Sequence, residues 1–182
     1  AMHRAMSFVN TPYVIFSDAN TLLNKSCIRN IVRNYKDQKV GGVAGEKKIM
    51  QSKSEGIAGT GEGLYWKYES FLKKLDWEFY TVVGAAGELF SLRTELYVYP
   101  GNHILLDDFI LSLTACKKGF RVAYEPDAYA METPSTSLKE EQKRKIRISA
   151  GAFQSMYILR SLLNVFRYPK LSFQDSSDRV LR

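Results

Sequence analysis

The chain has 182 residues, of which 45% are hydrophobic and 25% charged, and its formal net charge is +7. This length and composition predict one globular domain with a sizeable core. The positive charge favours an anionic partner, such as nucleic acid, an anionic membrane surface or a sugar phosphate. No apolar run is long enough to cross a bilayer and no signal peptide is present, so we expect a soluble piece whose start looks cut. Two distant cysteines, Cys27 and Cys116, fall on predicted helices and are expected to be reduced thiols in a cytoplasmic protein.

The first predicted strand covers residues 13–16, and an acidic corner follows it. Its residues are β-branched or aromatic without polar alternation, which indicates a strand buried on both faces in a parallel sheet. Asp18 and Asn20 come directly after it, where the ligands of open α/β sheets gather. With the small Ala19 between them, their oxygens suit Mg²⁺ or Mn²⁺. The alternative is that they only start a turn and cap the next helix.

Helices and strands then alternate along the chain. Apolar residues recur at helical spacing from Ile28 to Tyr35, and residues 40–45 form a small-residue strand. A second amphipathic helix is expected over residues 62–75. Residues 82–93 then predict a glycine turn, with Gly84, Gly87 and Glu88, that feeds another strand. Its backbone N–H groups could hold an acceptor hydroxyl or phosphate, or the turn could be a simple bend.

Adjacent carboxylates begin the next predicted helix, at Asp107 and Asp108. Acidic residues at a helix start are ordinary, because they favour the positive end of the helix dipole. A pair that follows an apolar run permits a second interpretation, in which mutual repulsion raises one pKa and makes a general base near neutral pH.

The last long helix is predicted over residues 137–164, and its two sides differ. One side is polar and carries Arg144, Arg147, Gly151 and Gln154 at positions i, i+3, i+7 and i+10. It could receive a pyrophosphate, lie against a membrane surface or be a solvated charged face. The other side is apolar and looks buried, with four residues: Ile146, Ala150, Phe153 and Tyr157.

Taken in this order, the segments resemble the membrane-bound family 2 glycosyltransferases, the inverting group that includes cellulose, chitin and hyaluronan synthases. Asp18-Ala19-Asn20 is similar to the D-x-D motif, with Asn20 in place of the final aspartate. Residues 84–93 resemble the turn and strand that line the acceptor site, and Asp107-Asp108 resembles the E-D dipeptide. Residues 144–148 fall where processive members carry Q-x-x-R-W, and Arg147 keeps the arginine. Arg144 and Ile148 replace the other two motif residues, which leaves processive and single transfer open.

The resemblance implies an α/β fold: an incomplete, Rossmann-like GT-A domain of three layers, with a mixed, mainly parallel sheet and its N-terminal nucleotide-binding strands missing. Residues 1–164 would form this partial domain, and residues 165–182 a membrane-proximal segment that precedes transmembrane helices. The whole protein would then lie at the cytoplasmic face of the cell membrane. We also expect that exposed strand edges allow a second copy of the chain to associate.

The resemblance also assigns roles to the residues. Asp108 would be the general base, Asp18 and Asn20 would hold Mg²⁺ or Mn²⁺, and Arg144 and Arg147 would bind the donor diphosphate. The acceptor would contact four residues, Gly84, Gly87, Glu88 and Asp107. The expected donor is a nucleotide-diphosphate sugar, with a uridine-diphosphate sugar as the first choice. The expected acceptor is a glycan or lipid-linked hydroxyl in polysaccharide or cell-surface glycan synthesis, and this truncated chain alone is expected to be inactive.

Two rival functions remain open from the sequence. The first is a catalytically silent membrane-surface or scaffold module of the same fold, which uses the basic helix to bind anionic lipid or a partner protein. The second is nucleic-acid binding through the basic stretch of residues 139–147. No recognition motif accompanies that stretch, so we expect no nucleic-acid partner.

Overall fold

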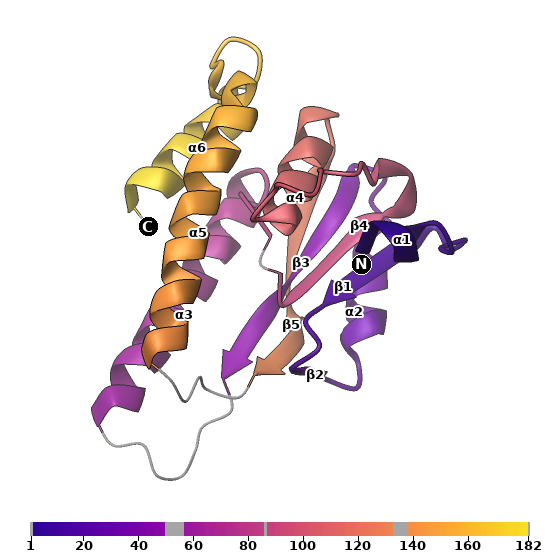
Figure 1. The fold of residues 1–182 in the computed structure, drawn as a ribbon. Coiled ribbons are helices and arrows are strands. Elements are labelled where there is room, and N and C mark those ends of the chain that lie inside the picture. The colour runs from indigo at the N-terminus through magenta and orange to yellow at the C-terminus, as the bar shows by residue number, and fades with distance from the viewer. Residues whose placement is uncertain (1, 50–56, 86, 133–137, 182) are drawn as a thin grey trace.

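The computed structural model describes residues 2–49, 57–85, 87–132 and 138–181 (Figure 1). The strands are β1 (Tyr13–Ser17), β2 (Thr21–Leu23), β3 (Val40–Ile49), β4 (Leu89–Arg93) and β5 (Arg121–Glu132). The α-helices are α1 (Met2–Met6), α2 (Cys27–Asn34), α3 (Ile57–Phe79), α4 (Asp107–Lys117), α5 (Leu138–Ile158) and α6 (Pro169–Leu181). The described residues also include two short 3₁₀ helices, η1 (Thr94–Leu96) and η2 (Arg160–Leu163).

The five strands form one mixed sheet in the order β1-β4-β3-β5-β2. Within the described residues β3 pairs with β5 in parallel, whereas β4 runs antiparallel to both of its neighbours and β2 antiparallel to β5. The mixed sheet confirms the expectation, but antiparallel pairs predominate where we expected parallel ones. Whether two strands pair in parallel or antiparallel depends on which strands become neighbours. An apolar run in the sequence does not predict its neighbours. Because β4 opposes both β1 and β3, the carboxyl ends of β1, β3 and β5 share one edge of the sheet.

Strand β1 corrects a second expectation. It lies at the sheet's edge beside β4, and residues 13–16 are half-buried, not buried on both faces. An apolar run without alternation is typical of a central strand, but here each face of β1 is only partly covered. The outer edges of β1 and β2 are free of strand partners in the described sheet, and association with a second copy stays a prediction.

Helices cover both faces of the sheet, which gives the expected three layers (Figure 1). On one face, α2 packs Cys27 and Ile31 against Val43 and Ala123. On the other face, α4 and the C-terminal helices pack around Phe90. Neighbouring residues of β4 contribute to opposite cores, as the alternation of side chains along a strand requires. Both cysteines are buried and neither forms a disulfide.

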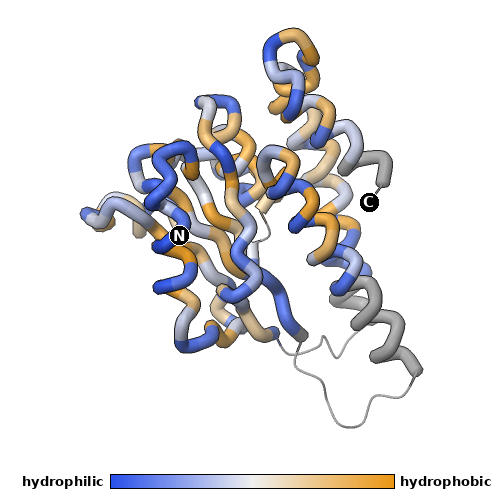
Figure 2. Tube along the Cα trace, turned by 180° about the vertical axis from the view of Figure 1, so that it is seen from behind, coloured by the Kyte–Doolittle hydropathy of each residue, from blue (hydrophilic) through white to orange (hydrophobic). Residues whose placement is uncertain are grey.

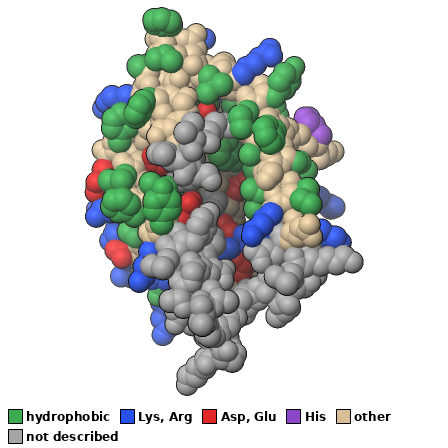
Figure 3. Space-filling model, turned by 90° about the vertical axis from the view of Figure 1, so that its left-hand side faces the viewer, with side chains coloured by type: hydrophobic (Ala, Val, Ile, Leu, Met, Phe, Trp, Pro, Cys, Tyr) green, Lys and Arg blue, Asp and Glu red, His purple; other side chains and the backbone are tan. Residues whose placement is uncertain are grey.

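The apolar side of α5 is exposed, and the expectation that it is buried is wrong. Ile146 is 62% exposed, and Phe153 and Tyr157 are each 71% exposed. Figure 2 shows hydrophobic and hydrophilic positions mixed along the C-terminal helices. The helical periodicity identified an apolar stripe on α5, but it does not predict whether another element covers that stripe. Figure 3 shows the hydrophobic side chains spread over this side of the molecule, with basic side chains between them.

The C-terminal segment folds back onto the domain. Leu171 of α6 belongs to the core, and the rings of Phe79 and Phe173 lie 5.8 Å apart. Among the described residues, no helix combines the length and the apolar character that a bilayer crossing requires. That residues 165–182 are membrane-proximal stays a prediction.

Candidate active site

The candidate site lies at the edge where β1, β3 and β5 end. Asp18 follows β1, Lys47 lies near the end of β3, and Glu132 is the last residue of β5. Glu88 directly precedes β4, which enters the sheet from this edge because it runs antiparallel to its neighbours. The strand order therefore gathers charged side chains from four parts of the chain.

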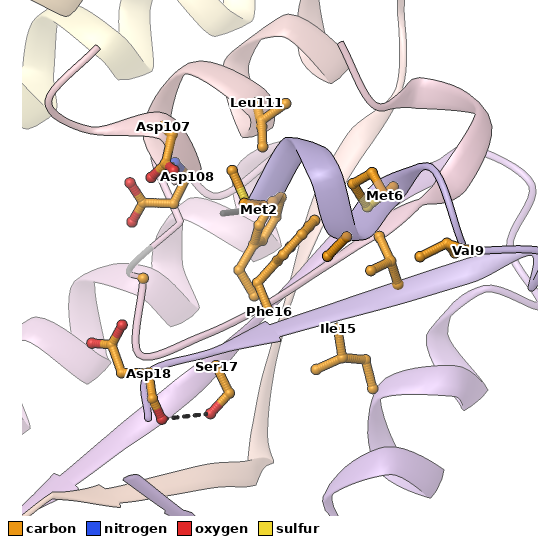
Figure 4. Close-up of a pocket in the computed structure, with 14 residues that line it drawn as sticks. Met2, Met6, Val9, Ile15, Phe16, Ser17, Asp18, Asp107, Asp108 and Leu111 are labelled. Carbon is orange, nitrogen blue, oxygen red and sulfur yellow. Dashed lines mark hydrogen bonds between the residues drawn. The ribbon is translucent and has the colours of Figure 1, made fainter. Parts of the chain in front are cut away.

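A cavity of about 400 Å³ joins this corner to the start of α4 (Figure 4). Asp18 lines it from β1, Gly87 from the glycine turn, and Asp107 and Asp108 from α4. In Figure 4 the carboxylates of Asp18 and Asp108 lie at the same end of the cavity, and apolar side chains such as Phe16 line the other. The structure thus brings together the acidic corner, the glycine turn and the acidic dipeptide that the sequence singled out.

The Asp108 carboxyl has a pKa near neutral pH. Burial raises its pKa to about 7, and the nearby charges of Asp107 and Glu88 add smaller increases. Backbone hydrogen bonds, first that of Phe109, act in the opposite direction. The expected pKa near neutrality is therefore found, but burial is its main cause and the repulsion from Asp107 is secondary.

Two glycines shape the wall beside this carboxyl. Gly84 has φ +76°, and a Cβ placed on it would lie 2.3 Å from the ring of Phe109, so the turn requires glycine. A Cβ on Gly87 would lie 3.1 Å from Asp108 Oδ2. Glycine at this position therefore leaves open space directly in front of the carboxylate. That these residues contact an acceptor stays a prediction.

Asp18 lies in an environment that favours a bound cation. Burial raises its pKa first, and the negative charges of Glu88 and Glu132 raise it further, while Lys47 and Arg144 lower it. A divalent cation would relieve that repulsion. Asn20 donates an amide hydrogen to Glu132 Oε1 at 2.9 Å, and its amide oxygen takes no part in that bond.

The described residues hold no group of three or more acidic, histidine or cysteine side chains that could bind a metal without help. Asp18 and Asn20 would supply two oxygen ligands to Mg²⁺ or Mn²⁺, and phosphate oxygens of a ligand would supply others. Binding of Mg²⁺ by a few protein oxygens together with substrate phosphates is common. The residues therefore fit a cation that is shared with a diphosphate ligand.

Glu88 is engaged with two cations and only 8% exposed. It accepts hydrogen bonds from Lys47 Nζ at 2.8 Å and from Arg144 at 2.9 Å. Burial acts to raise the pKa of Glu88, but Lys47 and then Arg144 outweigh it and hold the pKa below its ordinary value. In the structure Glu88 forms ion pairs with Lys47 and Arg144, and its predicted contact with the acceptor stays a prediction.

Helix α5 reaches the site through Arg144 and packs closely through a later turn. A Cβ on Gly151 would lie 2.6 Å from Leu106 Cγ, so the helix approaches the segment before α4 only because this residue is glycine. Gln154 donates to His103 O at 2.8 Å and accepts from Leu105 N at 3.0 Å. These contacts fix α5 against the segment that leads into Asp107 and Asp108.

Arg147 stands apart from this cluster. It is exposed one helical turn after Arg144, and no hydrogen bond or ion pair of its side chain is found among the described residues. Its predicted contact with the diphosphate stays a prediction.

Lys47 and Glu132 belong to the site, and the sequence analysis assigned a role to neither. The usable signal was their position, since each lies near the carboxyl end of a strand. Recognising them required knowing that β3 and β5 are parallel neighbours.

The fold and this site define a GT-A glycosyltransferase architecture. The structure is similar to that of the mannosyltransferase PcManGT from Pyrobaculum calidifontis, solved in complex with GDP-Man and Mn²⁺, with a TM-score of 0.70 and 17% sequence identity. The similarity covers 99% of this chain and 54% of that one, so the chain spans about half the length of the mannosyltransferase. A search of the curated proteins finds no match. The model of "Glycosyltransferase like family 2" matches residues 1–151, and the chain belongs to that family.

Proposed function

We propose that the protein transfers a sugar from a nucleotide-diphosphate sugar to an acceptor hydroxyl, with inversion at the anomeric carbon. The observation that carries the proposal is the shared cavity, where a carboxyl with a pKa of about 7 and a corner suited to a cation lie at the same end (Figure 4). Family membership and the mannosyltransferase neighbour, which binds GDP-Man and Mn²⁺, support the same chemistry.

The proposed reaction is a single displacement. Asp108 accepts the proton of the acceptor hydroxyl while the hydroxyl oxygen forms a bond to the anomeric carbon. The bond from that carbon to the diphosphate oxygen breaks, and its electron pair stays on the departing diphosphate. Arg144 and Arg147 stabilise the growing negative charge, and the open space at Gly87 admits the acceptor beside Asp108.

Asp18 and Asn20 would hold Mg²⁺ or Mn²⁺. When bound, the cation supplies positive charge to the diphosphate. The role of the chain's own residues is to bind and orient it, because the carboxylate of Asp18 gives charge and the amide oxygen of Asn20 gives a neutral ligand.

The experiment is a release assay on the full-length protein, with Mn²⁺ or Mg²⁺ titrated against a panel of nucleotide sugars. The panel includes uridine-diphosphate sugars, our first choice from the sequence, and GDP-mannose, which the neighbour binds. Nucleoside-diphosphate release should depend on metal and increase with a glycan or lipid-linked acceptor. NMR of the product then reads the anomeric configuration, and retention would contradict the proposed inversion.

Asp108→Asn is the matched control, because it preserves shape and removes the base. Its transfer rate should fall below 1% of the wild-type rate. Transfer at the wild-type rate in this variant would show that Asp108 is not the base. No release with any nucleotide sugar, together with binding to anionic vesicles, would favour the alternative of a catalytically silent membrane-surface module.

We further propose that the protein works at the cytoplasmic face of the cell membrane, in polysaccharide or cell-surface glycan synthesis. Residues 142–174 include seven basic residues and no acidic ones. The same stretch exposes large apolar side chains, and Phe166 in the turn before α6 is 100% exposed. Basic and apolar side chains together favour an anionic bilayer surface.

Vesicle co-sedimentation tests this location. The protein should bind vesicles with anionic phosphatidylglycerol more strongly than neutral phosphatidylcholine vesicles, and Phe166→Ser should weaken binding severalfold. Equal binding to both vesicle types would contradict the electrostatic part of the proposal.

A further inference from the structure

A buried ammonium group lies at the centre of the polar network beside the candidate site. The side chain of Lys47 on β3 is 3% exposed, and its Nζ forms ion pairs with Glu88, at 2.8 Å, and with Glu132. The carboxylate side chains are themselves 11% and 15% exposed. A buried cation between two carboxylates satisfies both, and its loss would leave two negative charges in a poorly solvated place.

Each of these carboxylates also holds a residue on the donor side of the site. Glu88 Oε1 accepts from Arg144 on α5 at 2.9 Å. Glu132 Oε1 accepts from the amide of Asn20, which follows β1, at 2.9 Å. Lys47 is thus linked to Arg144 through Glu88 and to Asn20 through Glu132. These links join α5 to the corner after β1, although the two are far apart in the sequence.

The network is balanced in charge, with the cations Lys47 and Arg144 against the anions Glu88 and Glu132. Asp18 lies within electrostatic reach of all four. Removing Lys47 would leave a surplus negative charge where a diphosphate and its cation must enter. It would also release the two carboxylates that orient Arg144 and Asn20.

We propose that Lys47 is a positioning residue for the donor diphosphate: it fixes Arg144 and Asn20 through Glu88 and Glu132 and does not itself contact the donor. The inference rests on the proposed transferase function. A purely structural ion pair would change stability alone, whereas a positioning residue changes the donor's affinity more than the acceptor's.

The test compares Lys47→Met with Lys48→Met in the full-length protein. Lys48 is the next residue of the strand, it is exposed, and its ammonium lies over the Tyr129 ring, 3.6 Å from the centroid, away from this network. Both variants lose one positive charge, so a general electrostatic effect is matched. The measurements are the KM for the donor, the KM for the acceptor, the thermal unfolding midpoint, and calorimetric binding of GDP or UDP with and without Mn²⁺.

Lys47→Met should raise the donor KM and weaken nucleoside-diphosphate binding at least tenfold, with the acceptor KM within twofold of wild type. Lys48→Met should stay within twofold of wild type in both KM values and in nucleotide affinity. A folded Lys47→Met protein with unchanged donor KM and nucleotide affinity, or two variants with equal effects, would overturn the proposal.

If Lys47→Met does not fold, Lys47→Arg tests the positioning role in its place. Arginine keeps the charge but changes the distances that the proposal depends on, so the donor KM should rise severalfold with a normal acceptor KM. A donor KM within twofold of wild type in Lys47→Arg would overturn the proposal. Calorimetry separates the proposed transferase function from the positioning role of Lys47. A wild-type protein that binds nucleoside diphosphate but transfers no sugar contradicts the transferase function, and the effect of Lys47→Met on that binding still tests the positioning role. A wild-type protein that neither binds nucleoside diphosphate nor transfers sugar contradicts both.

Discussion

The carboxylates of the candidate site fall into two groups whose surroundings act on the pKa in opposite directions. At the end of β5 and beside β4, Glu132 and Glu88 are held ionised, because Lys47 lowers their pKa values against the effect of burial. At the start of α4, burial raises the pKa of Asp108 to about 7, and the causes that lower it are backbone hydrogen bonds. The same chemical group can thus anchor positive charge in one place and exchange a proton in the other.

The environment of each carboxyl, and not its residue type, therefore determines whether it is ionised near neutral pH. A departing diphosphate requires cations that stay in place, and a network of ion pairs holds them there. An attacking hydroxyl requires a group that gains a proton near neutral pH, and an apolar wall provides it. Substitutions can therefore alter the Asp108 carboxyl and the cation-binding corner separately.

The largest effect is expected at Asp108. Asp108→Asn should lower kcat by about 10³-fold, the middle of the range for losing a general base. The same variant should unfold less readily at pH 8, because ionising a carboxyl whose pKa is raised from 3.8 to about 7 costs the folded state up to about 4 kcal/mol.

This stability gain has a defined pH window. The folded state binds the Asp108 proton more tightly, so the wild type loses stability as the pH rises from about 4 through 7, and the variant does not. Chemical denaturation at pH 5 and pH 8 measures the difference. Asp107→Asn, which neutralises the exposed neighbour, serves as the control and should change stability by less than about 0.5 kcal/mol. Equal stability of wild type and Asp108→Asn at both pH values would contradict the raised pKa.

The next largest effect is expected at Asp18. Asp18→Asn removes the charge of the proposed cation ligand and keeps its size, so kcat/KM should fall by roughly 10²-fold and half-saturation by Mn²⁺ should shift upward. Metal titration of nucleoside-diphosphate release measures both. Unchanged metal dependence in this variant would show that Asp18 does not hold the cation.

The pH profile separates burial from repulsion as the source of the Asp108 pKa. In wild type, kcat/KM should rise about tenfold per pH unit below 7 and level off above it. Because Asp107 is a secondary cause, Asp107→Asn should move this limb to lower pH by less than about one unit. A larger move would make repulsion the main cause.

The smallest effect is expected at Gln154, which joins α5 to the segment before α4. Gln154→Ala removes two hydrogen bonds in an exposed place and should cost about 1 kcal/mol of unfolding free energy and a few-fold in kcat. The control is Phe153→Ala, because that neighbouring side chain is 71% exposed and should change neither quantity measurably. If both variants behave alike, the contact does not position α4.

Several features of the site could be predicted from sequence because they are local. Asp18 follows an apolar run, Asp108 follows another, and Arg144 shares a helix face with Gln154. Each pattern needs only a strand end or a helical repeat to be interpreted, and the structure brings these residues to one region.

The remainder depended on pairing that no single segment encodes. The edge position of β1 and the parallel contact between β3 and β5 depend on which strands become neighbours. The positions of Lys47 and Glu132 near strand ends were therefore not enough to assign them to the site. The exposed apolar side of α5 was misjudged because periodicity describes a stripe and not what covers it.

The close approach of α5 also has a consequence for the order of folding. Arg144 meets Glu88 across 56 residues, and Gln154 meets His103 across 51. Closing a loop of that length costs more conformational entropy than closing a local turn. During synthesis Asp18, Glu88 and Asp108 emerge from the ribosome before α5 does. The nascent chain therefore carries these acidic residues before Arg144, and the ion pair between Glu88 and Arg144 forms only once α5 has emerged.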